Sequence, residues 1–419
     1  MLYTSRYRSH HDAAQTLKKK FTMEISTEDY LEKKLLEKPQ KPLVLYLHVP
    51  FCNKICSFCP FHRPDKLQRR FYHEYLTEEI RAIRHFPFLQ GEVGAINFGG
   101  GTPTALLPEQ MNLVLKELRN SFCIREDAEI SLESSATELS DAMLEVLVEN
   151  GVNRLSIGIQ TFWDEVRKQF GRRGSGEFAA SRVKRAMEYG ITNTNIDLLY
   201  RYPNQTDEQL QDDLRIIREL GIAGLSFYAL RIHENTPLYN RLSGEEKARM
   251  EDPEREYALY NCITEELAKD GFEALELTKL VRNHLDKYEY MALRHGGGSC
   301  IAIGQGAGGC IDGYYYRNPE NRVLISEQLP FSRAGRVVAP EFKIYDDLIY
   351  QLQKGRVNLG AFSKRLGRNL EDCLKDKLER LTAEGLLESC DGEIVMTNAG
   401  RFWGNNIVDE LLRRITEEL

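Results

Sequence analysis

Three cysteines, Cys52, Cys56 and Cys59, lie within a segment of eight residues. Thiolates this close along the chain can share one metal centre. A structural zinc site usually takes four protein ligands, commonly as two pairs, and no second cysteine pair lies near these three. A [4Fe–4S] cluster has four irons, so three cysteines leave one iron open to another ligand. The spacing therefore favours an iron–sulfur cluster over a zinc site or incidental cysteines.

The rest of the composition restricts the class of protein. The nine cysteines are an odd number in a chain of 419 residues, which argues against a disulfide framework. The net charge of −7 argues against a general nucleic-acid binder. No apolar run is long enough to predict a membrane-spanning helix, and the first residues are polar and basic without the apolar core of a secretory signal. We therefore expect a cytoplasmic protein.

Short runs rich in β-formers alternate with amphipathic helical patterns between residues 44 and 230. Six strand–helix units predict a parallel sheet with right-handed crossovers, which could close into a partial barrel or lie open as a doubly wound sheet. In either arrangement ligands bind at the carboxyl ends of the strands. The predicted strands are Val44–Val49, Ala95–Phe98, Glu129–Glu133, Arg154–Gln160, Asn195–Tyr200 and Gly224–Leu230. The predicted helices are Arg70–Phe86, Pro108–Ser121, Ser140–Asn150, Glu177–Tyr189 and Thr206–Leu220.

Composition divides the chain into four regions. We expect an N-terminal arm over 1–40, the strand–helix region over 41–235, and a less regular Gly- and Tyr-rich region over 236–338 that covers the substrate. The last region, 339–419, predicts a helical domain with a winged-helix-like order and a hairpin around Asp391 and Gly392. A lid or packing role suits this acidic chain better than DNA binding.

Longer motifs, together with the cysteine spacing, indicate a resemblance to a known family. From about residue 43 to the C-terminus, the sequence resembles the oxygen-independent coproporphyrinogen-III oxidase group of the radical S-adenosylmethionine (SAM) superfamily. The resemblance rests on YLHVPFC with CxxxCxxC, FGGGTPT (98–104), NRLSIGIQTF (153–162) and NIDLLYRYPNQT (195–206). It implies an α/β fold with a partial (β/α)6 barrel, and a [4Fe–4S] cluster on the three cysteines. In this family SAM chelates the open iron, and an electron from the cluster releases a 5′-deoxyadenosyl radical.

The same resemblance implies roles for residues at the strand ends. Tyr46 and Phe58 would flank SAM and the cluster, while glycine backbone after the second strand would approach the methionyl amino group. Other positions would bind polar groups of SAM. The implied cofactor-binding residues are Tyr46, Phe58, Gly100, Gly101, Thr102, Glu133, Gln160, Arg172 and Asp197.

Three branches of the group differ in short motifs. The classical dehydrogenases carry a further cysteine where this chain has Phe61, and the heme chaperones carry an HNxxYW segment that is absent from 288–295. The anaerobic heme-degrading branch, the anaerobilin synthases, resembles this chain at 304–309, 314–316 and 397–403. That branch implies a redox enzyme and C-methyltransferase, which moves a methyl-derived carbon from SAM to a meso carbon of heme. The ring then opens to a linear tetrapyrrole and releases iron.

This reaction would use one or two molecules of SAM and a low-potential donor of the flavodoxin or ferredoxin type. A heme chaperone and a coproporphyrinogen-III dehydrogenase are the alternatives. Arginines suit the propionates of a tetrapyrrole, and a histidine could ligate its iron. The candidate arginines are Arg231, Arg282 and Arg294, and the candidate histidines are His48, His62 and His295. Cys310, just after the Gly-rich loop, is a candidate hydrogen-atom donor, although a small buried residue is the plainer interpretation.

Overall fold

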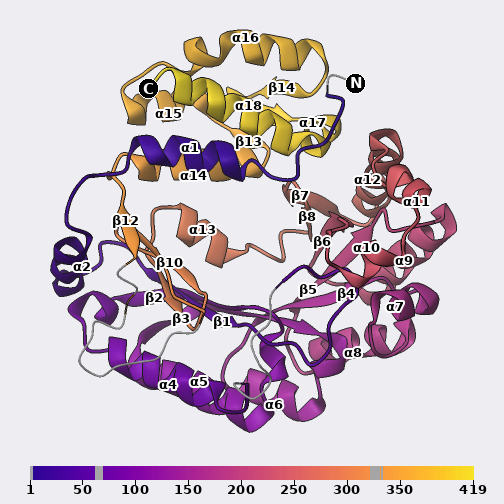
Figure 1. Ribbon diagram of the computed structural model, residues 1–419, viewed down its shortest axis with the longest axis horizontal. Coiled ribbons are helices and arrows are strands. Elements are labelled where there is room, and N and C mark those ends of the chain that lie inside the picture. The colour runs from indigo at the N-terminus through magenta and orange to yellow at the C-terminus, as the bar shows by residue number, and fades with distance from the viewer. Residues whose placement is uncertain (1–2, 62–68, 321–330, 332–333) are drawn as a thin grey trace.

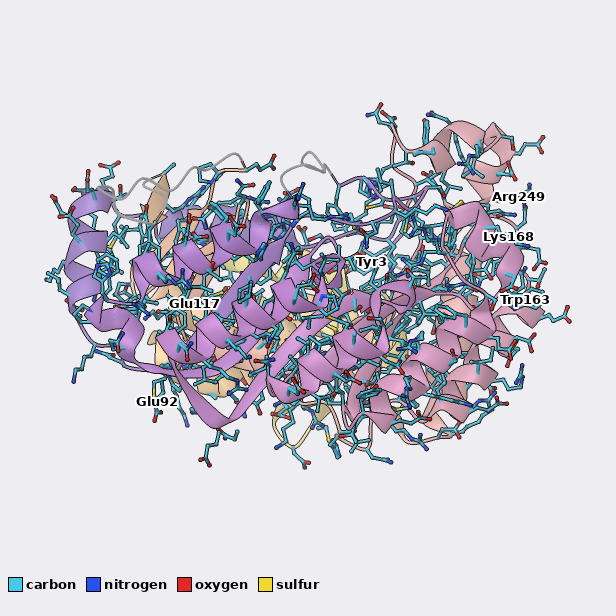
Figure 2. All side chains as sticks on the ribbon, turned by 90° about the horizontal axis from the view of Figure 1, so that it is seen from below. Tyr3, Glu92, Glu117, Trp163, Lys168 and Arg249 are labelled. Carbon is cyan, nitrogen blue, oxygen red and sulfur yellow. The ribbon has the colours of Figure 1, made fainter. Side chains whose placement is uncertain are left out.

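A computed structural model describes residues 3–61, 69–320, 331 and 334–419. A curved sheet forms the centre of the molecule, with a layer of helices on its outer face and the C-terminal helices across its open side (Figure 1). The outer helices are α4 (Tyr72–Ile83), α5 (Pro108–Ser121), α6 (Asp141–Glu149), α8 (Gly176–Glu188) and α9 (Asp207–Leu220). Arg81 of α4 pairs with Glu117 of α5 at 2.6 Å, and Figure 2 shows Glu117 on this outer layer.

Six parallel strands follow one another in the sheet in chain order, so the strand order never reverses among them. A doubly wound sheet requires such a reversal, and the structure therefore confirms the partial barrel. The strands are β1 (Leu43–Val49), β2 (Glu92–Gly100), β3 (Cys123–Ser135), β4 (Arg154–Gln160), β5 (Asn193–Tyr200) and β6 (Gly224–Ala229).

Local sequence explains how these units begin and end. The hydroxyl of Thr206 accepts from the N–H of Gln209 at 3.2 Å, and the Gln209 side chain accepts in return from the N–H of Thr206, which forms a capping box at the start of α9. The helix ends at Gly221, whose φ of 67° lies in the left-handed region that favours glycine. The expected end at Gly221 is confirmed.

Six further strands extend both edges of the sheet, and of these the sequence indicated only the aromatic one at 314–316. Beyond β1 lie β9 (Cys300–Ile303), which is parallel to it, and then the antiparallel β10 (Gly308–Ile311), β11 (Tyr314–Arg317) and β12 (Gly335–Val337). Beyond β6 lie the antiparallel β8 (Lys279–Arg282) and β7 (Phe272–Glu276). The 236–338 region therefore contributes strands to the barrel sheet as well as loops.

The N-terminal segment carries two helices, α1 (His11–Lys20) and α2 (Thr27–Leu36). Helix α1 lies beside α14 (Phe342–Gln353) in Figure 1 and contacts α18 (Gly404–Glu417). The residues before α1 also contact the C-terminal helices. The guanidinium of Arg6 donates to the Phe402 carbonyl at 2.6 Å and lies over the Phe402 ring.

The C-terminal domain has the predicted order of helices and hairpin. After α14 come β13 (Arg356–Val357), α15 (Leu359–Leu366), α16 (Leu370–Ala383), β14 (Leu387–Cys390), β15 (Glu393–Met396), α17 (Asn398–Phe402) and α18. The hairpin turns at Asp391 and Gly392, both at positive φ, as a two-residue turn between twisted strands requires. No helix in the described segments has the length and apolar character needed to span a bilayer.

Candidate active site

A cavity of about 1880 Å³ opens at the carboxyl ends of the six barrel strands. Side chains alternate across a strand, so the lining residues recur at every second position, as Tyr46 and His48 do in β1. Pockets for one small molecule usually measure roughly 300–1000 Å³. The cavity therefore has room for SAM together with a second, larger ligand.

All three cysteines and all nine predicted cofactor-binding residues line this cavity. They come from segments as far apart as residues 46 and 197, and only the fold brings them together. Their individual roles stay predictions, whereas their convergence on one cavity is observed. The residues are Tyr46, Cys52, Cys56, Phe58, Cys59, Gly100, Gly101, Thr102, Glu133, Gln160, Arg172 and Asp197.

The cysteine loop follows β1 and is anchored by its middle residues. Ser57 donates its N–H to the Phe170 carbonyl and its hydroxyl to the Gln169 carbonyl, both at 2.8 Å. The Phe58 ring packs edge-on against Phe170, with the ring centroids 5.1 Å apart. These contacts hold the loop against α7 (Asp164–Phe170) and leave its thiols on the cavity wall.

Two of the thiols already accept hydrogen bonds. The Thr102 hydroxyl donates to Cys52 Sγ at 3.3 Å, and Arg172 Nη1 donates to Cys56 Sγ at 3.5 Å. In the described part of the chain, no three histidine, cysteine or acidic side chains gather closely enough to hold one metal ion. A [4Fe–4S] cluster binds its cysteines through separate irons, so its ligands stand further apart than those of a single ion. Three soft thiolates around open space fit such a cluster.

Glycines keep the strand ends clear for a cofactor. A Cβ at Gly99 would lie 3.0 Å from Glu133 Oε1, and one at Gly158 would lie 2.9 Å from Gln160 Nε2. Gln160 itself has a φ of 75°, which is uncommon for a residue with a side chain and accompanies a register shift at the end of β4. Because such strain gathers at functional sites, it fits the expected contact of Gln160 with SAM.

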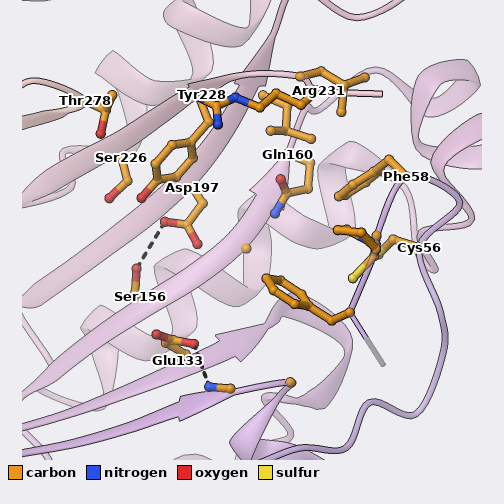
Figure 3. Close-up of a pocket in the computed structure, with 18 of the residues that line it drawn as sticks. Cys56, Phe58, Glu133, Ser156, Gln160, Asp197, Ser226, Tyr228, Arg231 and Thr278 are labelled. Atoms are coloured by element: carbon orange, nitrogen blue, oxygen red, sulfur yellow. Dashed lines mark hydrogen bonds between the residues drawn. The ribbon is translucent and has the colours of Figure 1, made fainter. Parts of the chain in front are cut away.

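Two carboxyls face the cavity, Glu133 from β3 and Asp197 from β5, with β4 between them (Figure 3). Burial, reinforced by repulsion from Asp197, raises the pKa of Glu133 to about 7. The N–H of Gly100 donates to Glu133 Oε2 at 3.3 Å, and the Ser156 hydroxyl donates to Asp197 Oδ1 at 3.2 Å. Carboxyls with most of their lone pairs unused can accept from the amino and hydroxyl groups of SAM.

We predict that SAM affinity rises between pH 6 and pH 7.5 because ionised Glu133 is the better acceptor. With a pKa of about 7, the ionised fraction grows about eightfold over this range. Glu133→Gln should bind SAM more weakly and lose this pH dependence. Isothermal titration of the reconstituted protein measures both effects, with Glu251→Gln elsewhere on the lining as the control. An unchanged pH profile in Glu133→Gln would exclude Glu133 as the titrating contact.

His48 also lines the cavity, beside Tyr46. Tyr46 Oη and His48 Nδ1 share a hydrogen bond of 2.9 Å. Burial, aided by the charge of Arg317, lowers the pKa of His48 below its usual value. The imidazole is therefore neutral at pH 7, which is the form that ligates iron.

Several predicted substrate residues do not reach the cavity. Cys310 lies on β10 beside Tyr315 and Lys18, and burial raises the pKa of its thiol to about 11. Its position after the Gly-rich loop predicted a place in the cavity. Gln305 and Gly306 of that loop do line the cavity, but Cys310 on β10 is not among the lining residues. A hydrogen-donor role for Cys310 is therefore not supported. Arg282, Arg294 and His295 are also absent from the lining, and His62 lies outside the described residues.

Sequence reasoning missed part of the lining. Arg6 and Arg8 belong to the polar N-terminal segment, where nothing in the sequence distinguishes them from solvated charges. Arg201 could have been found, because it directly follows β5 within the 195–206 motif. Arg231 is the one predicted propionate-binding arginine that does line the cavity.

Comparison with known families agrees with this geometry. The radical SAM superfamily model matches residues 46–217, and the HemN C-terminal domain model matches residues 346–403. The first match contains the end of β1 from Tyr46, the cysteine loop and strands β2 to β5. Radical SAM proteins use a [4Fe–4S] cluster and SAM, the two cofactors that the cavity residues fit.

Individual relatives cover most of the chain. Anaerobilin synthase of Escherichia coli O157:H7 is 28% identical over 89% of this chain and 84% of its own length. Heme chaperone HemW of Lactococcus lactis is 27% identical over 89% of this chain and 98% of its own. The solved structure of coproporphyrinogen III oxidase (HemN) from Escherichia coli superimposes with a TM-score of 0.78 at 24% identity, over 98% of this chain and 96% of that one. This likeness shows the fold.

Proposed function

We propose that this chain, whose residues 46–217 match the radical SAM superfamily model, opens the heme macrocycle without oxygen and gives a linear tetrapyrrole and free iron. SAM would be both the radical source and the donor of the transferred carbon, as one or two molecules. A low-potential protein of the flavodoxin or ferredoxin type would supply electrons. The 28% identity to anaerobilin synthase supports this choice of substrate.

The observation that carries the proposal is the single cavity shared by the cysteine loop and the strand ends. Its 1880 Å³ exceeds what one small ligand needs. A tetrapyrrole in the remaining space would therefore lie in the same enclosure as SAM, where a short-lived radical can reach it.

The chain's own residues would bind the cluster, SAM and heme and orient them relative to one another. Reduced cluster and SAM, when bound, supply a carbon radical that can add to the conjugated ring. Cys52, Cys56 and Cys59 would hold the cluster. Glu133 and Asp197 would accept hydrogen bonds from SAM and fix its position in the cavity. Neutral His48 is the candidate ligand for the heme iron.

The decisive experiment combines the reconstituted protein with SAM, ferric heme and a strong reductant in the absence of oxygen. We expect the heme absorption bands to disappear and a SAM-dependent linear tetrapyrrole to appear by mass analysis, together with free iron. SAM cleavage with unchanged heme would contradict ring opening.

Two further assays, of heme transfer and of coproporphyrinogen turnover, distinguish the alternatives. Stable binding and transfer of intact heme would indicate a chaperone, a class whose HNxxYW segment this chain lacks. Conversion of coproporphyrinogen to a divinyl product would indicate a dehydrogenase, a class whose extra cysteine is replaced by Phe61.

A further inference from the structure

Four of the arginines that line the cavity form one group: Arg6 and Arg8 of the N-terminal segment, Arg201 after β5, and Arg231 after β6. The three segments meet through direct contacts. Arg6 Nη1 donates to the Tyr200 hydroxyl at 3.0 Å, and Arg231 Nη2 donates to the Arg8 carbonyl. We call this group the arginine corner. Figure 3 shows Arg231 in the same pocket as Gln160 and Cys56.

One carboxylate forms ion pairs with two members of the arginine corner. Buried Glu256 pairs with Arg6 through one oxygen and with Arg201 at 2.5 Å through the other. Within the segments that the structure describes, no carboxylate lies within ion-pairing distance of Arg8 or Arg231. The corner therefore holds four positive charges against one negative charge, and its two unpaired guanidiniums lie on the cavity wall.

Neighbouring groups respond to this excess positive charge. Burial, together with repulsion from Arg8, Arg6 and Arg201, lowers the pKa of Arg231 to about 10, although Glu256 opposes the change. Burial and the charges of Arg8 and Arg231 also lower the pKa of His233. A partly buried charge without an ion-pairing partner, such as that of Arg231, is costly unless an anion joins it.

We propose that Arg8 and Arg231 bind the carboxylate side chains of the tetrapyrrole substrate, while Glu256 holds Arg6 and Arg201 in position beside them. The inference rests on the proposed function, because it takes a tetrapyrrole as the ligand. Guanidinium groups pair with carboxylates through two parallel hydrogen bonds. The propionates are the carboxylates of heme, so the corner fixes which edge of the macrocycle faces it.

The test measures binding of ferric heme without reductant, so it does not depend on ring opening. Holoprotein is titrated with heme and with heme dimethyl ester, in which both carboxylates are blocked. Arg8→Gln and Arg231→Gln should each weaken heme binding about tenfold, as expected for one lost charge-assisted contact. Affinity for the diester should stay the same in both variants.

Arg249→Gln is the matched control, because Arg249 is exposed, lies away from the cavity lining and loses the same charge. Arg8 is also exposed, and its side chain makes no hydrogen bond to the residues that the structure describes, so its variant should fold normally. Circular dichroism and SAM titration check each variant.

The outcomes separate the two proposals. Equal affinity of the wild-type protein for heme and its diester, or equal weakening of both ligands in the variants, would overturn the carboxylate assignment alone. Loss of SAM affinity with unchanged heme affinity would show that the corner binds the carboxylate of SAM. This result would also overturn the assignment of the corner to the tetrapyrrole carboxylates. Carboxylate-selective heme binding without ring opening would contradict only the proposed function. No heme binding at all would contradict both.

Discussion

Cys56→Ser is expected to abolish assembly of the iron–sulfur cluster. Serine keeps the shape of the side chain, but its hydroxyl does not ionise near neutral pH and is a poor ligand for iron, which prefers thiolate in such clusters. Iron should fall from about four per chain toward zero after anaerobic reconstitution. Reductive cleavage of SAM should fall with it, because the electron has no other route. Iron and sulfide analysis with electron paramagnetic resonance measures the loss.

Cys123→Ser makes the same chemical change at an exposed position of β3 away from the cavity. This control should retain full iron content and SAM cleavage. Because Arg172 donates to Cys56 Sγ, circular dichroism should accompany the analysis to show that Cys56→Ser remains folded. A folded Cys56→Ser protein with a complete cluster would remove Cys56 from the ligand set.

Asp286→Asn is expected to lower the free energy of unfolding by about 3–5 kcal/mol. Asp286 has 0% side-chain exposure, accepts from Arg154 at 2.9 and 3.0 Å, and pairs with Lys279 at 3.0 Å. Burial opposes the charge of Asp286, but Arg154 and Lys279 outweigh this effect and hold its pKa well below the usual range. Asparagine would remove the nearest counter-charge of both buried cations and leave Arg154 only Glu129, at 3.9 Å. Urea denaturation measures the difference.

The pH range of this effect follows from the depressed pKa. The carboxylate stabilises the fold above the pKa of an unfolded aspartate, about 3.9, and that contribution disappears as pH falls through the lower folded value. The gap between wild type and Asp286→Asn should therefore be constant between pH 6 and pH 8. Asp141→Asn is the control, because the Asp141 side chain is 45% exposed and water screens its pairs with Arg182 and Arg185, so its loss should be far smaller. Comparable losses in the two variants would contradict the buried-network explanation.

The barrel strands could be predicted because each is a buried run between turn signals. β4 and α5 were predicted at their observed bounds. The strands β7 to β10 and β12 were missed because three to five residues are too few to show a period. Helices α1 and α2 were missed because their mostly polar residues hide a narrow apolar stripe, such as Ala13 and Leu17 of α1, that packs against distant parts of the chain.

The site was predictable where motif residues end parallel strands, since the fold itself brings such ends together. Glu133, Gln160 and Asp197 follow this rule and line one cavity. Proximity along the chain did not predict the lining correctly at Cys310. The preceding loop lines the cavity, whereas Cys310 on β10 does not. Arg8 could not be found, because its place on the cavity depends on where residues 402–406 hold the N-terminal segment.

The hydrogen bond from Arg6 to the Phe402 carbonyl joins residues 396 positions apart in sequence. A ribosome makes the chain from the N-terminus, so Arg6 emerges long before its partner exists. The cysteine loop and the six parallel strands are translated in between. The position of Arg6 in the arginine corner therefore depends on residues that are made last, and termination before residue 402 would remove the carbonyl that accepts from Arg6.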